Sequence, residues 1–150
     1  MKTNEQNKTR IIESLRVWIA QRPGLEYGNY GTRQSYQSEV RAITKDLHHA
    51  RDLIRAVELS SITGEQLAAA FSRAYSGRLS WDGERLDYCC GQYWPTEYRR
   101  AVCAVCASAL WDYYREDFAA AKRGKESDGD SIRRKFRQMF GRTIQMRWFD

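Results

Sequence analysis

The sequence predicts a mostly α-helical (α+β) single domain spanning 1–150, a compact bundle of about five helices carrying a small β-hairpin. Apolar residues recur at helical spacing in several long segments. One Asp-Gly pair lies between two short alternating runs, which is the pattern of a hairpin. Hydrophobic residues make up 42% of the 150 residues, enough for one core at this length. No repeat, low-complexity tract or linker divides the chain.

The first two helices are expected in the N-terminal third of the chain. The first covers about residues 5–21 and is ended by Pro23-Gly24. The second follows an apolar stripe whose members recur at alternating steps of four and three: Tyr36, Val40, Ile43, Leu47, Ala50, Ile54 and Val57. Such a stripe packs within the chain, as in a monomeric bundle, or forms a homodimer. The other amphipathic helices favour the bundle.

A short helix and a hairpin are expected next. Thr63 and Gln66 form a capping-box pattern that opens a helix ended by Gly77. Asp82-Gly83 then predicts a two-residue hairpin turn, because both central residues of the favoured turn need positive φ. The alternating run 143–149 is a candidate third strand that joins this hairpin.

The longest helix is expected from Pro95 or Thr96 to about Lys122. Residues 101–109 are nearly apolar all round, which is typical of a central helix. After a polar loop, Asp130 or Ser131 is expected to cap a final short helix. Its inward-facing residues are Ile132, Phe136, Met139 and Phe140.

Neither a catalytic constellation nor a cofactor site is predicted. Cys103 and Cys106 have a CxxC spacing that zinc sites use, but they fall within a helical pattern, which favours plain core packing. Asp112 and Glu116 are four apart on one helix face and are the best pair for an enzyme. A solvated helix face explains them better, because they flank aromatic residues rather than a loop. The protein is therefore expected to bind rather than to catalyse.

Charge is placed unevenly along the chain. The net charge is +6, from 25 Lys and Arg against 19 Asp and Glu. Residues 131–150 carry six of these cations and one acid, which leaves 19 cations and 18 acids in residues 1–130. We predict that this basic end binds a partner through Arg133, Arg134, Lys135, Arg137, Arg142, Arg147 and Trp148.

Three interpretations of the basic end are open. Arginine forks bind phosphate oxygens and neighbouring aromatic side chains stack on unpaired bases, so the partner is RNA or DNA. Arg and Trp also anchor protein interfaces, so an acidic protein surface or a nucleoprotein complex fits as well. The third interpretation is a solvated face that happens to be cationic.

The chain is expected to stay in the cytoplasm without contacting a membrane. The N-terminal residues 1–8 are polar, where an export signal needs an apolar stretch. No apolar run approaches the roughly 20 residues that a membrane span needs.

Three segments carry a resemblance to proteins of mobile elements. They are Tyr27-Gly28-Asn29-Tyr30-Gly31, Trp81–Tyr88 and Trp94–Arg100. They are similar to small orphan proteins of phages, plasmids and integrative elements, and in size and lack of catalytic motif the chain resembles anti-CRISPR proteins. The resemblance implies a stoichiometric inhibitor that binds Cas protein subunits, another bacterial nucleoprotein complex or guide-RNA phosphate. It carries over no site residues.

Overall fold

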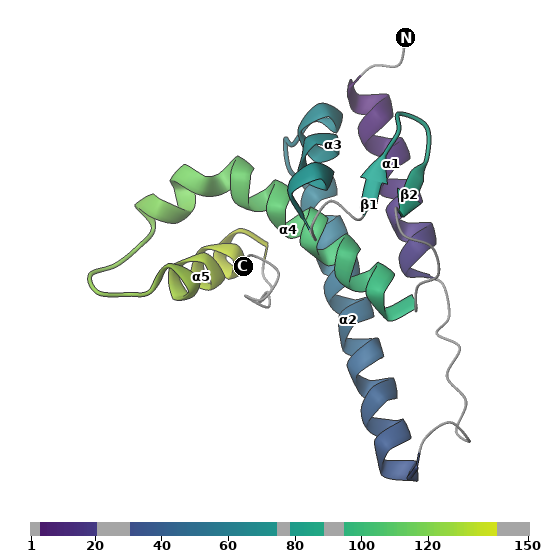
Figure 1. The fold of residues 1–150 in the computed structure, drawn as a ribbon. Coiled ribbons are helices and arrows are strands. Elements are labelled where there is room, and N and C mark those ends of the chain that lie inside the picture. Colours follow the sequence, from purple (N-terminus) through teal and green to yellow (C-terminus); the bar gives the residue numbers. More distant parts are fainter. Residues whose placement is uncertain (1–3, 21–30, 75–78, 89–94, 141–150) are drawn as a thin grey trace.

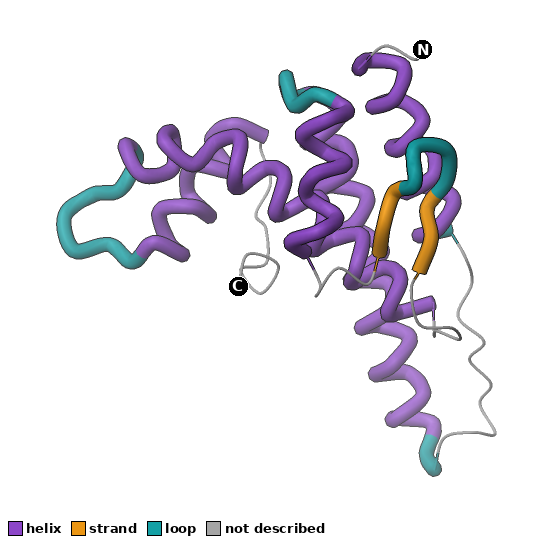
Figure 2. The backbone as a smooth tube through the Cα atoms, turned by 45° about the horizontal axis from the view of Figure 1, so that its top comes forward, coloured by secondary structure: helices purple, strands orange, loops and turns teal. Residues whose placement is uncertain are grey.

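The computed structural model of the protein describes residues 4–20, 31–74, 79–88 and 95–140. Over these ranges the chain forms five helices and one two-stranded sheet (Figures 1 and 2). The predicted mostly helical bundle with a small hairpin is confirmed. In chain order the elements are α1 (Asn4–Ile19), α2 (Arg33–Leu59), α3 (Gly64–Arg73), β1 (Leu79–Trp81), β2 (Leu86–Tyr88), α4 (Pro95–Ala120) and α5 (Asp128–Phe140).

The first half of α4 is the centre of the core. Eight of the ten residues from 101 to 110 are buried, as expected for a stretch that is apolar all round. Helices α1, α2 and α3 all pack against α4. The nearly continuous apolar surface of this segment is therefore what lets three other helices pack around it.

Helix α2 packs through its C-terminal half. Ala50, Ile54 and Val57 of the predicted stripe are at most 1% exposed. Leu53 and Ala56 are buried as well, because α2 contacts α1 as well as α4 and so buries more than one stripe. In Figures 1 and 2 the N-terminal half of α2 extends past the other described helices.

The first turn of α3 is fixed by side chains at its N-terminus. The Gln66 backbone N–H donates to the Thr63 hydroxyl oxygen at 3.1 Å, and the Thr63 N–H donates to the Gln66 side-chain oxygen at 2.9 Å. The predicted capping box is confirmed. The helix ends at Arg73, and Gly77, which was expected to end it, lies outside the described residues.

The hairpin has a longer turn than predicted. Trp81 pairs with Leu86, so residues 82–85 form a four-residue loop and the two-residue Asp82-Gly83 turn is wrong. The Asp82 carboxylate accepts the Glu84 and Arg85 N–H groups at 2.7 and 2.9 Å, which stabilises the wider turn. Gly83 supplies the positive φ, at 101°. The candidate third strand, 143–149, lies outside the described residues.

Candidate partner-binding surface

The basic helix belongs to an arm that projects from the bundle. We define the arm as residues 111–140, which comprise the second half of α4, a loop and α5. In Figures 1 and 2 the two helices of the arm lie side by side, and α4 packs against α5. Phe118 is 1% exposed and stacks on Trp111 with ring centroids 5.6 Å apart. The arm therefore has an apolar interior of its own.

One face of α5 attaches the helix to α4 and to the core. Ile132 and Phe136 are at most 4% exposed, as the sequence predicts. The predicted cap, Asp130 or Ser131, is wrong by three residues or more. Ser127 precedes the helix, its hydroxyl accepts the Asp130 N–H at 3.2 Å, and its carbonyl accepts the Ser131 N–H at 3.0 Å. The earlier cap adds a turn to the N-terminal end of α5.

The opposite face of α5 presents cations to solvent. Arg133 and Arg137 are exposed and lie four residues apart, about 6 Å along the axis. Arg133 forms a long 3.7 Å ion pair with Asp130, three residues earlier. Arg137 forms no ion pair within the part of the chain that the structure describes. Lys135 is half-buried. Among the predicted contact residues that the structure describes, Arg133 and Arg137 are therefore the best placed to meet a partner.

Arg134 has a different environment from Arg133 and Arg137, the two arginines with which the sequence prediction grouped it. Its Nε and Nη2 atoms donate to the two carboxylate oxygens of Glu126 at 3.2 and 3.0 Å, and Nη2 also contacts the Ala121 carbonyl oxygen. The hydrogen bonds from Arg134 lower the pKa of the Glu126 carboxyl, with help from the Arg123 N–H. This bidentate pair ties α5 to the loop that follows α4. Arg134 thus positions the arm.

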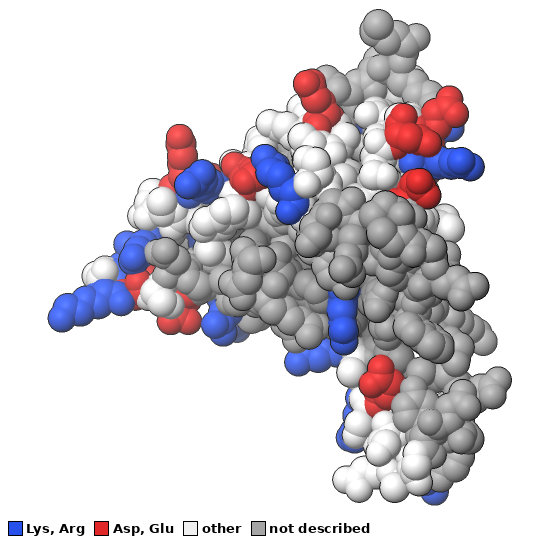
Figure 3. Space-filling view, in the orientation of Figure 1, with Lys and Arg blue, Asp and Glu red and all other residues white. Residues whose placement is uncertain are grey.

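The other predicted contact residues, Arg142, Arg147 and Trp148, lie outside the described residues. Figure 3 shows Lys and Arg side chains along the arm, with Asp and Glu side chains interspersed among them. The described part of the basic end is therefore a small cationic face on one helix, and the surface around it carries both positive and negative side chains.

Asp112 and the two cysteines of α4, which were considered for chemistry, have structural roles, whereas Glu116 is exposed. Asp112, on α4, forms an ion pair with Arg73 of α3, so this carboxylate joins two helices. Cys103 and Cys106 are both fully buried in the core, and burial raises the pKa of Cys106 to about 12. The expected core packing of these two thiols is confirmed. Cys89 and Cys90 lie outside the described residues.

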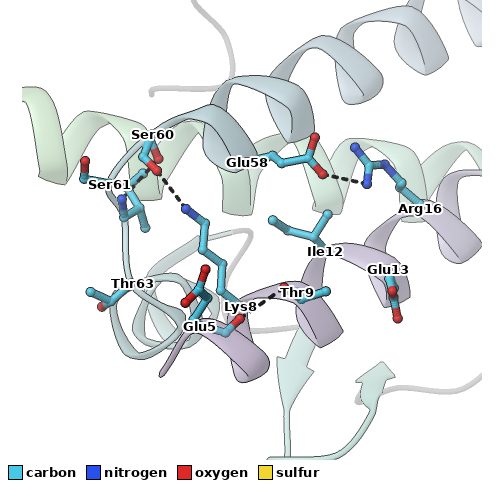
Figure 4. A pocket seen from close by; sticks show the side chains of 11 residues that line it. Glu5, Lys8, Thr9, Ile12, Glu13, Arg16, Glu58, Ser60, Ser61 and Thr63 are labelled. Carbon is cyan, nitrogen blue, oxygen red and sulfur yellow. Dashed lines mark hydrogen bonds and ion pairs between the residues drawn. The ribbon is translucent and has the colours of Figure 1, made fainter. Parts of the chain in front are cut away.

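A pocket of about 570 Å³ lies between α1 and the turn that joins α2 to α3 (Figure 4). The Lys8 ammonium donates to the Ser60 carbonyl oxygen at 2.8 Å, and desolvation lowers its pKa. Glu58 accepts from Arg16 at 2.9 Å and from Arg55 at 2.8 Å. Sequence patterns do not reveal this pocket, because its walls come from segments more than 40 residues apart.

Neither a metal site nor a membrane-spanning helix is found in the described ranges. No group of three or more His, Cys, Asp or Glu side chains there is placed to hold a metal ion. No helix there is both long and apolar enough to cross a membrane. Comparison of the chain with protein-family models, with curated proteins and with solved structures finds no match.

Proposed function

We propose that the protein is a non-enzymatic inhibitor of host defence carried by a mobile element. It binds subunits of a CRISPR effector complex through the exposed face of α5. The observation that carries the proposal is the division of α5 into two faces, with Phe136 buried on one and Arg133 and Arg137 exposed on the other. The resemblance of three segments to mobile-element proteins supports the class of partner.

Two kinds of contact hold α5 in place. Burial of Ile132 and Phe136 and the bidentate pair between Arg134 and Glu126 fix the helix before any partner arrives. A fixed helix loses little conformational entropy on binding, so its guanidinium groups bind at a lower cost than they would on a disordered tail. Arg133 and Arg137 are therefore a preorganised pair of cations for an acidic or phosphate-bearing surface.

An alternative function uses the same two arginines. A nucleic-acid-binding accessory protein would place them on backbone phosphates, and its affinity would fall log-linearly with salt concentration. Nucleoprotein surfaces offer acidic side chains and phosphate together, so nuclease treatment separates the two functions.

The test measures defence and binding with one pair of variants. Bacterial strains that each carry one active CRISPR system are challenged with a targeted plasmid, with and without the protein. We expect the protein to restore transformation in at least one strain and to co-purify with Cas subunits after nuclease treatment. Arg133→Glu with Arg137→Glu should abolish both effects.

Arg85→Glu is the matched control, since Arg85 lies on the hairpin loop and its side chain is 84% exposed. It should behave as the wild type. If no strain is protected, or if the α5 variant inhibits as well as the wild type, the proposed function is wrong. Recovery of nuclease-sensitive material alone supports the accessory protein instead.

A further inference from the structure

A second cationic site lies away from the arm, in a groove between the C-terminal end of α1 and the second half of α2. The groove has a volume of about 370 Å³. Of the described residues that line it, three are arginines, Arg16, Arg51 and Arg55, and the others are Ile19 and Ala20. The arginines come from two helices, so the sequence pattern of neither helix indicates the groove.

The two α2 arginines share one face of the helix. Arg51 and Arg55 are four residues apart, and both are exposed. Three further basic side chains lie on the same solvent-facing side of α2 at steps of three and four residues. These are Arg41, Lys45 and His48, and all three are exposed. The groove is therefore the inner end of a basic stripe that runs along α2.

Among the residues that the structure describes, acidic side chains do not cancel this charge. Glu58 accepts hydrogen bonds from both Arg16 and Arg55, at 2.9 and 2.8 Å, so one carboxylate is shared by two guanidinium groups. Arg51 forms no ion pair with the residues that the structure describes. Counting the half-buried Asp52 beside it, the three arginines still exceed the two acids.

A buried arginine satisfies a carbonyl group at the edge of the groove. The carbonyl groups at the C-terminal end of a helix carry partial negative charge, which would repel an anion. Arg99 is 3% exposed, and its Nε donates to the Ile19 carbonyl oxygen at 3.1 Å. Its charge therefore offsets the helix end at the edge of the groove, where Ile19 is a lining residue.

We infer that this groove and stripe bind the phosphodiester backbone of a nucleic acid. Guanidinium groups bind phosphate oxygens in a bidentate manner, and they keep their charge at all physiological pH values. Cations repeated along one helix face match a ligand with repeated phosphates better than they match a single carboxylate. The inference does not depend on α5 or on the function proposed for it.

The test measures fluorescence anisotropy with three fluorescein-labelled 20-mers, namely single-stranded RNA, single-stranded DNA and duplex DNA, over a KCl series. Arg51→Gln with Arg55→Gln should weaken binding of at least one probe about tenfold at low salt. It should also lower the slope of log Kd against log salt by about two, roughly one for each phosphate that the variant no longer binds. Arg51→Gln alone should lower the slope by about one.

Two controls keep the test specific. Arg85→Gln removes an exposed cation far along the chain and should leave both affinity and slope unchanged. Arg133→Gln with Arg137→Gln measures how much the arm contributes to binding of the probes. The proposal for the groove and the proposal for α5 can therefore fail independently. Thermal unfolding followed by circular dichroism checks that each variant is folded.

Four results would overturn the inference. The first three are that the double groove variant binds as the wild type does, that Arg85→Gln weakens binding as much as the groove variant, and that the wild type binds none of the three probes. A polyglutamate peptide of matched charge that competes as well as unlabelled RNA also overturns it, since the groove then takes acidic protein rather than phosphate.

Discussion

Truncation of Phe136 should detach α5 from the rest of the protein. The Phe136 side chain is 2% exposed and belongs to the main core cluster, whereas Ser131 and Ile132, the other α5 residues described as buried, lie near its start. A buried aromatic side chain removes about 150–250 Å² from water, which at about 25 cal/mol per Å² is worth about 4–6 kcal/mol. Alanine keeps part of that contact, so the expected loss for Phe136→Ala is about 3–5 kcal/mol.

That loss is large against the stability of the protein. A domain of this size unfolds at a cost of about 5–15 kcal/mol, so Phe136→Ala removes a substantial share. Urea titration followed by circular dichroism measures the change in the free energy of unfolding. Hydrogen exchange read by mass spectrometry then locates it, and we expect amides of 131–139 to lose protection while those of 101–110 keep it.

Gln138→Ala is the matched control, because Gln138 is an exposed residue of the same helix. It should change the free energy of unfolding by less than about 0.5 kcal/mol. A loss below about 1 kcal/mol for Phe136→Ala would show that this ring does not anchor α5. Equal loss of protection in α4 would show that the arm and the bundle are one cooperative unit.

Other residues give sharper local predictions. Thr63→Ala should lower the free energy of unfolding by about 1 kcal/mol in urea titration, because it removes the hydroxyl of the capping box, while Thr63→Ser should cost less. Cys106 should resist iodoacetamide at pH 8 in the folded protein and react in guanidinium chloride, because burial raises its pKa to about 12. Hydrogen bonds to Glu58, of which the bond from Arg16 has the largest effect, lower the pKa of its carboxyl below the ordinary value of 4.5. The stability that these hydrogen bonds contribute is therefore fully present above pH 4.5. It is lost as pH falls through the lowered folded-state pKa, and Glu58→Gln should flatten the pH dependence of thermal unfolding in that window.

Periodicity and capping residues predicted most of the helices, because both act over three or four residues. The apolar run 101–109 identified the central helix, and the Thr63–Gln66 pair identified the start of α3. The start of α5 was predicted wrongly because capping signals are local in this way. Ser127, Asp130 and Ser131 are all good capping residues within five positions, and local propensity does not rank them.

The environment of Arg134 was not predictable from the helix alone. Because Arg134 lies three residues before Arg137, helical periodicity predicted that both side chains face solvent on the same side of the helix. Its partner Glu126 lies eight residues earlier, in the loop between α4 and α5 and outside the helix whose periodicity grouped the arginines. The groove between α1 and α2 was not predictable for a related reason, since Arg16 and Arg55 are nearly 40 residues apart.

The sequence and the structure locate the positive charge of the protein in different ways. Along the chain, residues 1–130 are nearly neutral, and the excess lies in the last twenty residues. In the folded protein, however, a segment with almost no net charge can still form a cationic surface, because its basic side chains gather on one side of a helix. Helix α2 directs Arg41, Arg51 and Arg55 to one exposed side, while Glu58 is shared between two arginines. Net charge per segment therefore underestimates how many surfaces of this protein can bind an anionic partner. A variant that neutralises only α5 should leave the affinity of the α2 groove for nucleic acid intact.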